Sequence, residues 1–196
     1  MSLAERAPTT RHLLNYYRPE DVVGINISKK QLETCKINAP GCKFLLMNAT
    51  ELAFDDHSFD NVICVEAASH FDTRKDFLAE ACRVLKPGGR LALSEVLHTR
   101  WNVAEIGLTP TENYIRGLEE YRNLYLRVGF EQVEVVDRTY ECWVSFCADS
   151  VRYLRDRLVS KQIDQLTHKQ RMDGLARKDL AIGYYVLTCA LRGASR

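Results

Sequence analysis

Apolar residues along the chain follow two alternating patterns. Short runs of consecutive apolar residues, rich in β-branched side chains, predict buried strands. Between these runs, apolar residues recur every three or four positions, as on the buried face of a helix. The predicted strands cover 21–27, 43–47, 61–65, 90–94, 132–137 and 183–191, and the predicted helices cover 11–17, 29–38, 72–85, 109–128 and much of 148–177.

Two of these helices carry clear boundary signals. The helix at 72–85 places Phe77, Leu78 and Ala81 on one face, and the Lys-Pro-Gly-Gly run at 86–89 stops it because proline and glycine oppose continuation. The run Thr-Pro-Thr-Glu at 109–112 combines a T-x-x-E capping box with a proline at the first helical position. A helix is therefore expected from 109 to about 128.

The alternation of strands and helices predicts an α/β fold with a doubly wound, mostly parallel sheet. A length of 196 residues suits a single domain over 1–196, and the chain contains no internal repeat or low-complexity segment. In such sheets ligands bind at the carboxyl ends of strands. The residues that follow each predicted strand are therefore the candidate site.

Composition narrows the range of partners. The net charge of +1 gives no general argument for nucleic acid or an acidic membrane, and no run of about 18 apolar residues predicts a membrane span. The first residues lack the basic stretch and apolar core of a secretory signal. Seven cysteines without a CxxC pair predict reduced thiols in a cytoplasmic protein, and no metal site.

The stretch VVGINISKKQ, at 22–31, contains the first candidate site. Asn26 and Ile27 end the predicted strand, and the next turn brings Gln31 back over Asn26. Two side-chain amides offer donors and acceptors that can bridge ribose hydroxyls. The alternative is a capped helix, with Asn26 or Ser28 as N-cap and Gln31 as a solvated surface residue.

Two further strand ends carry polar residues. After the strand at 43–47 comes Asn48-Ala49-Thr50, where an amide and a backbone N–H can read the edge of adenine; the alternative is a polar turn. After the strand at 61–65 comes Glu66, facing the ligand crevice, and then His70, which can take a substrate proton. The alternative for His70 is a histidine that caps or packs.

Together these stretches resemble the class I methyltransferases that use S-adenosylmethionine, within the small-molecule group that acts on sugars, sterols and sarcosine or synthesises cyclopropanes. The resemblance covers residues 10 to about 192. The segments that carry it are VVGINISKKQ, NATELAFDDHSFDNVICVEAASHF, RVLKPGGRLALSEV and LYLRVGFEQVEVVD, in the order in which the family has them.

The resemblance implies methyl transfer from S-adenosylmethionine to a hydroxyl, amine or carbon of a small molecule. His70 would take the substrate proton, and the insertions 97–113 and 142–180 would lie on the substrate side. The residues implied to bind the cofactor are Asn26, Ile27, Gln31, Asn48, Ala49, Thr50 and Glu66. The residues implied to line a substrate pocket are Trp101, Tyr114 and Tyr121, for which core packing is the alternative.

The sequence departs from the family pattern at two places. Asn48 stands where the family usually has an aspartate, and its amide oxygen still accepts a hydrogen bond. The family's first strand, of the kind VLDVGCGxG, has no counterpart, and Gly24 is the first glycine in the chain. The expected fold is therefore truncated at its N-terminus. Because the missing strand is normally central, its neighbours would keep unpaired edges or pair directly.

The alternative function is a non-catalytic homologue, or a shortened form, that acts as a binding or oligomerisation module. A homodimer could then cover the exposed sheet edges. A nicotinamide-dependent dehydrogenase would also need a glycine-rich first turn and has no support from the later segments. Nucleic acid is an improbable partner because no basic stripe with interleaved aromatics occurs.

Overall fold

The structure, a computed structural model, describes residues 8–99 and 109–194. Its chain divides into two compact units, Met1–Asp55 and Asp56–Arg196. The grouping of 1–196 into one domain stays a prediction.

The first unit is a small parallel sheet with short helices. Strand β1 (Val23–Asn26) pairs with β2 (Lys43–Leu46), so that Gly24 lies opposite Phe44. A Cβ atom on Gly24 would lie 2.7 Å from the Phe44 ring, which explains why this strand carries a glycine. The other elements of the unit are α1 (Pro8–Leu13), η2 (Pro19–Asp21) and α2 (Lys29–Asn38).

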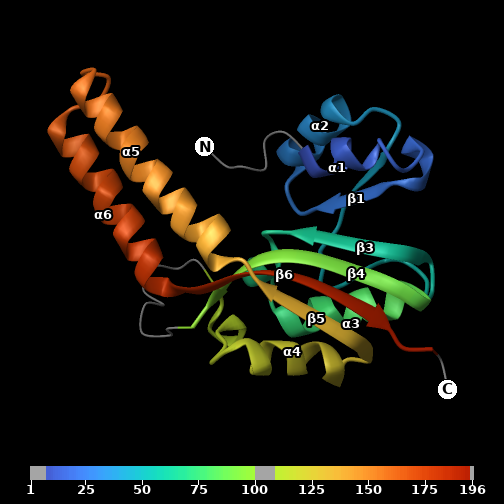
Figure 1. Ribbon diagram of the computed structural model, residues 1–196. Coiled ribbons are helices and arrows are strands. Elements are labelled where there is room, and N and C mark those ends of the chain that lie inside the picture. Colours follow the sequence, from blue (N-terminus) through green and yellow to red (C-terminus); the bar gives the residue numbers. More distant parts are fainter. Residues whose placement is uncertain (1–7, 100–108, 195–196) are drawn as a thin grey trace. The chain divides into compact units, whose positions relative to one another are not determined.

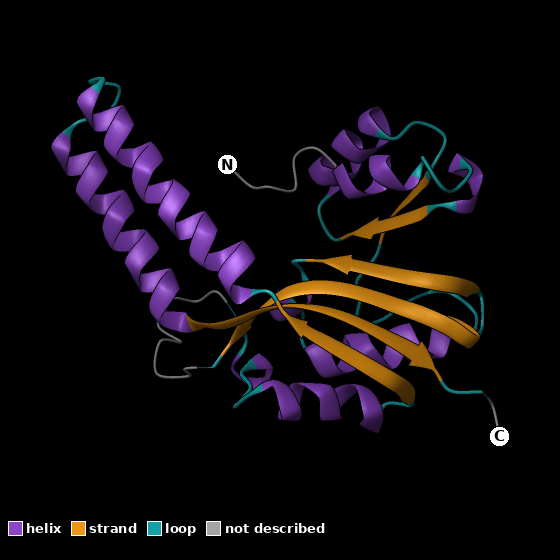
Figure 2. Ribbon diagram, in the orientation of Figure 1, coloured by secondary structure: helices purple, strands orange, loops and turns teal. Residues whose placement is uncertain are grey.

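The second unit contains a four-stranded sheet in the order β3-β4-β6-β5 (Figures 1 and 2). The strands are β3 (Phe59–Val65), β4 (Leu85–His98), β5 (Phe130–Asp137) and β6 (Ile182–Arg192). Strands β3 and β4 are parallel, and β6 is antiparallel to both β4 and β5. Three strands therefore run in one direction, and the predicted α/β class with a mostly parallel sheet is confirmed.

Helices α3 (Arg74–Val84) and α4 (Leu118–Arg127) cover one face of this sheet (Figure 1). Strand β4 supplies the core for that face: Leu91, Leu93 and Leu97 are at most 4% exposed, whereas alternate residues such as Ala92 are exposed. Glu95 belongs to the same buried row, so a carboxylate stands among leucines. A carboxylate buried at this position requires hydrogen-bonding or charged partners.

The prediction of a helix at 109–128 is wrong for the first half of this range. Residues Thr111–Asn113 form only a short 3-10 helix, η5, and α4 begins at Leu118 after an extended Gly117. The capping box at 109–112 does not form, because the Thr109 hydroxyl bonds to His98 instead. Tertiary contacts have here overridden a local helix signal.

The turn expected at 86–89 lies within β4 as a bulge. The sheet pairing jumps from Phe59 opposite Leu85 to Asn61 opposite Arg90, so the intervening residues loop out of register. Gly88 has a φ of +76°, a conformation that a side chain would disfavour.

The segment between β5 and β6 is helical. A π-helical turn, η6 (Thr139–Val144), leads into α5 (Ser145–Val159), and α6 (Gln165–Ala181) packs against α5 as an antiparallel pair (Figure 1). This pair accounts for most of the predicted insertion at 142–180, whose role on the substrate side stays a prediction.

Candidate functional site

The first unit brings together the two amides expected to act as a pair. The Asn26 Nδ2 donates to Gln31 Oε1 at 2.7 Å, and the Asn26 Oδ1 accepts from the Ser28 backbone N–H at 2.8 Å. Ser28 is the N-cap of α2, since its hydroxyl accepts from the Gln31 N–H. The helix cap thus fixes the turn, and both amides lie side by side at the carboxyl end of β1. Ile27 between them is 77% exposed.

The next strand end in this unit forms a tight polar turn. The Asn48 Oδ1 accepts from the Thr50 backbone N–H at 3.1 Å, which closes an Asx turn over Ala49. Asn48 is exposed and Ala49 is 9% exposed. The polar turn, which is the alternative for Asn48-Ala49-Thr50, is therefore present. Adenine binding by these residues stays a prediction.

In the second unit, Glu66 directly follows β3 and has an unusual backbone conformation. Its φ is +50°, a region that residues with side chains rarely adopt. Two contacts hold it there: its N–H donates to the Ser94 carbonyl at 2.7 Å, and its Oε1 accepts from the Tyr185 hydroxyl at 2.8 Å. Burial and the bond to Glu66 raise the pKa of Tyr185 to about 12, so this phenol stays protonated. Sequence reasoning did not predict the Tyr185 contact, which spans 119 positions.

His70 lies on the loop that follows β3. It ends the 3-10 helix η3 (Ala68–His70), with Ala68 fully buried and Ser69 only 3% exposed. His70 itself is exposed. The backbone of this loop is therefore anchored in the core while the imidazole is accessible, as a group that exchanges protons with a ligand requires.

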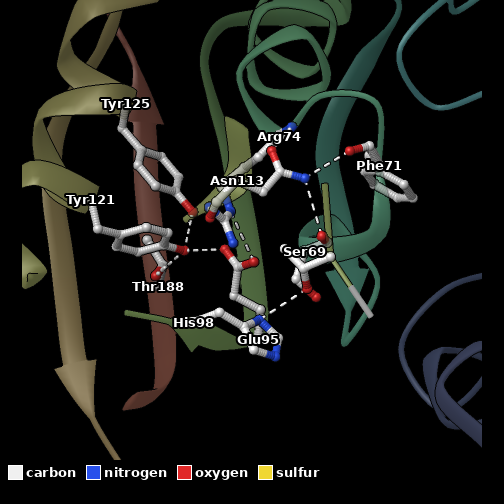
Figure 3. A network of polar contacts seen from close by, with 10 residues as sticks. Ser69, Phe71, Arg74, Glu95, His98, Asn113, Tyr121, Tyr125 and Thr188 are labelled. Carbon is white, nitrogen blue, oxygen red and sulfur yellow. Dashed lines mark hydrogen bonds and ion pairs between the residues drawn. The ribbon is translucent and has the colours of Figure 1, made fainter. Parts of the chain in front are cut away.

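Next to this loop lies a buried ion pair between α3 and β4 (Figure 3). The Arg74 Nε donates to Glu95 Oε2 at 3.0 Å, with the two side chains 1% and 0% exposed. The Arg74 Nη1 donates to the Asn113 carbonyl at 2.6 Å, while Nη2 has no hydrogen-bond partner among the residues that the structure describes. The guanidinium lies 5.8 Å from the centre of the Tyr121 ring, a cation–π distance.

Hydroxyl groups complete the contacts of Glu95 (Figure 3). The Tyr121 hydroxyl donates to Glu95 Oε1 at 2.7 Å and also contacts the hydroxyls of Tyr125 and Thr188. Burial raises the pKa of Glu95, and Arg74 and Tyr121 act against this rise. Burial also holds the pKa of both tyrosines well above the usual range. The network therefore contains neutral phenols around one carboxylate.

His98 ends β4 close to this network. It is 5% exposed, its Nδ1 shares a 3.0 Å hydrogen bond with the Thr109 hydroxyl, and its ring lies 6.0 Å from that of Tyr114. Burial lowers the pKa of His98 to about 4, helped by the electrostatic influence of Arg74 and His70. His98 is therefore a neutral imidazole at neutral pH.

This lowered pKa predicts a loss of stability in acid. An unfolded histidine titrates near 6.5, so the stabilisation is complete above pH 6.5 and is lost as the pH falls towards about 4. We expect His98→Gln, which cannot be protonated, to reduce the loss over this range by on the order of 2–3 kcal/mol. Urea unfolding at several pH values measures it, with His12→Gln, at an exposed position, as the control. Equal acid sensitivity of the wild type and His98→Gln would contradict the expectation.

The predicted substrate residues have three different environments. Trp101 lies outside the described residues. Tyr114 is half-buried beside His98. Tyr121 is fully buried in the network, which favours the core-packing alternative for it. Their contact with a substrate stays a prediction.

Several polar residues of the second unit were missed by sequence reasoning. Arg74, Glu95, His98 and Asn113 are each at most 5% exposed, and they contact one another or neighbouring segments. Only Glu95 left a signal, as a carboxylate in the run RLALSEVLH. Within the described residues, no group of three or more His, Cys, Asp or Glu side chains is placed to hold a metal ion. The helices in that part of the chain do not include one that is long and apolar enough to span a membrane.

Comparisons with known proteins agree with this architecture. The family described as "Methyltransferase domain" matches residues 7–93. Erythromycin 3''-O-methyltransferase from Saccharopolyspora erythraea is 27% identical over 78% of this chain, and a phthiotriol/phenolphthiotriol dimycocerosates methyltransferase from Mycobacterium ulcerans is 34% identical over 43% of it. The chain spans 56% of the first protein's length and 32% of the second's.

Solved structures share the fold. A putative sarcosine dimethylglycine methyltransferase from Galdieria sulphuraria superposes with a TM-score of 0.79 over 97% of this chain and 76% of its own, at 17% sequence identity. At that identity the likeness concerns the fold. The predicted Rossmann-like architecture is therefore confirmed by the arrangement of the backbone as well as by the element order.

Proposed function

Because this chain belongs to the class I methyltransferases, we propose that it binds S-adenosylmethionine and takes part in methyl transfer to a hydroxyl, amine or carbon of a small molecule. The observation that carries this proposal is the pair of amides of Asn26 and Gln31, held 2.7 Å apart at the carboxyl end of β1. The acceptor named for the Saccharopolyspora relative is an oxygen, which favours a hydroxyl among the three acceptor classes. A cytoplasmic location belongs to the same proposal.

The residues of the first unit fit the nucleoside part of this cofactor. The Gln31 Nε2 makes no hydrogen bond within the described part of the chain, and the Asn26 amide has further bonding capacity beyond its two contacts. Two vicinal hydroxyls present the donors and acceptors that such amides need. The exposed Asn48 amide and the adjoining Ala49 and Thr50 would contact adenine, and Ile27 would contribute apolar surface.

The second unit contains the other residues that the family resemblance implies. Glu66, with its backbone fixed by Ser94 and its carboxylate by Tyr185, would accept hydrogen bonds from the cofactor. S-adenosylmethionine, when bound, supplies an electrophilic methyl group. His70 would accept the proton that leaves the substrate hydroxyl or amine at its exposed imidazole. Trp101 and Tyr114 would line the apolar part of the substrate pocket, whereas Tyr121 lies in the core.

The amide pair gives a direct test of cofactor binding. We expect Asn26→Ala combined with Gln31→Ala to weaken binding of S-adenosylmethionine and S-adenosylhomocysteine by roughly tenfold or more, because two hydrogen-bonding groups are lost. Isothermal titration measures both affinities. Lys30→Ala, at an exposed position in the same turn, is the matched control and should bind as the wild type does. If neither ligand binds the wild type at millimolar concentration, the proposed function is wrong.

A second candidate function rests on the sheet edges. Among the described strands, β3 pairs only with β4, and β1 pairs only with β2, so the second edge of each is unpaired. An unpaired edge offers backbone donors and acceptors to another chain. We propose a homodimer that covers the edge of β3 as the alternative, in which the chain acts as an oligomerisation module.

Light scattering after size exclusion tests the dimer. We expect the wild type to elute as a dimer, and Ile63→Lys to shift it to a monomer, because a charge on β3 opposes pairing of the edge. Ile63 is 42% exposed, so the lysine would not disturb the core. Val159→Lys, at a 77% exposed position on α5, is the control and should remain a dimer. A monomeric wild type would remove this alternative.

A further inference from the structure

A single buried side chain holds both ends of the loop that carries His70. Asn113 is 1% exposed and ends η5, in the connection between β4 and α4. Its Nδ2 donates to the carbonyl of Ser69 at 3.1 Å and to that of Phe71 at 2.7 Å. Its Oδ1 accepts from the backbone N–H of Arg74 at 2.7 Å. Figure 3 shows this amide between the loop and the buried ion pair.

The hydrogen bonds of the Asn113 amide hold the backbone on both sides of His70. Ser69 and Phe71 are the two neighbours of His70 in the chain, and the backbone carbonyls of both accept from the Asn113 amide. Arg74 is the first residue of α3, so the third bond fixes the other end of the loop. His70 has its backbone held from both sides while its side chain is exposed.

The chemistry of the contact requires an asparagine. The position needs one acceptor for an N–H and two donors for carbonyls, and a primary amide is the small side chain that offers both. An aspartate keeps the acceptor but loses both donors and places an anion against two carbonyls. A leucine fills the space but leaves buried backbone groups without partners.

A further hydrogen bond connects Asn113 to the sheet through Arg74. The Asn113 backbone carbonyl accepts from Arg74 Nη1 at 2.6 Å, and Arg74 in turn donates to Glu95 on β4. The segment around Asn113 is thereby attached to the buried ion pair. Hydrogen bonds therefore connect the loop, the segment around Asn113 and β4 next to the backbone of His70.

We propose that Asn113 is a positioning residue, which fixes the orientation of His70 for proton transfer without itself touching the substrate. The catalytic part of this inference rests on the proposed function, because only methyl transfer gives His70 its role. The positioning part does not, since it concerns the loop 69–74 alone.

Hydrogen exchange tests the positioning part without any ligand. We expect Asn113→Asp and Asn113→Leu to accelerate amide exchange in a peptide covering 69–77 by at least about tenfold, because the loop opens without global unfolding. Tyr125→Phe is the matched control: it removes a hydroxyl from the same buried network and no contact of the loop. Exchange in β6 should be unchanged in each variant, which shows that the fold is intact.

Activity tests the catalytic part. In transfer of a labelled methyl group from S-adenosylmethionine to a panel of small alcohols and amines, we expect Asn113→Asp to lower kcat by about tenfold or more and to leave the KM for S-adenosylmethionine within about twofold. Tyr125→Phe should retain kcat. If Asn113 only stabilised the buried network, Asn113→Asp and Tyr125→Phe would change kcat alike.

The two measurements separate the possible failures. If loop exchange in Asn113→Asp matches that in Tyr125→Phe, the positioning role is overturned, and Asn113→Leu decides in the same way should the aspartate variant fail to fold. If the loop opens but kcat stays at the wild-type value, the link to His70 is overturned while the proposed function stands. If the loop opens and the wild type transfers no methyl group, the proposed function fails and the anchoring of the loop is retained.

Discussion

Arg74→Leu is expected to lower the free energy of unfolding by about 3–5 kcal/mol, one of the largest effects of a single substitution in this chain. The reason is the carboxylate that it leaves behind. Glu95 is fully buried, and Arg74 is the cation that opposes the rise of its pKa. Without Arg74 the carboxylate must stay charged in an apolar row or take up a proton.

Chemical denaturation of purified variants measures this loss. The double variant Arg74→Leu with Glu95→Leu should be more stable than the Arg74→Leu single variant, because the unpaired charge is gone. The deficit of Arg74→Leu should also shrink in acid, where a carboxyl of raised pKa is neutral. Arg138→Ala breaks an exposed ion pair with Glu141 and is the control, with little effect expected. A loss in Arg74→Leu no greater than in this control would contradict the role of the pair.

His70→Ala is expected to lower kcat by about 10²-fold to 10⁴-fold, the range typical for the loss of a general base. The KM for S-adenosylmethionine should change little, because the imidazole is exposed and its backbone is held by other residues. Stability should also be retained, since no buried side chain is altered.

Release of S-adenosylhomocysteine in a single turnover measures this step for each acceptor in the panel. His12→Ala, at an exposed position on α1, is the matched control and should keep the wild-type rate. A His70→Ala enzyme with the wild-type rate on every acceptor that the wild type methylates would show that proton removal does not depend on this residue.

Local spacing was sufficient where the contacts are local. The bounds expected for the second helix, 29–38, match α2, because its cap at Ser28 and its stop before Pro40 lie within the segment itself. Asn26 and Gln31 were recognised for the same reason: they are five positions apart, and one turn of helix brings them together.

Contacts between distant segments explain what could not be predicted. Arg74 reads as a solvated residue at a helix start, and only Glu95, 21 positions away, makes it a core residue. Asn113 stands in a segment with helix-start signals, but its side chain is committed to backbone groups 42 and 44 positions away. The sequence on either side of Arg74 or Asn113 does not indicate such a partner. The false helix start at 109 and the missed site residues therefore have one cause.

The bond between Asn26 and Gln31 has a consequence for ligand selectivity. The Asn26 Nδ2 and the Gln31 Oε1 already bond to each other at 2.7 Å, so a ribose hydroxyl that uses either of these two atoms exchanges one hydrogen bond for another. When a ligand lacks a hydroxyl, the Asn26 Nδ2 and the Gln31 Oε1 can bond to each other again, so neither atom loses its partner. A site rejects a deoxy analogue strongly only if its own groups are then unpaired. This pair should therefore orient a nucleoside more than it discriminates ribose from deoxyribose.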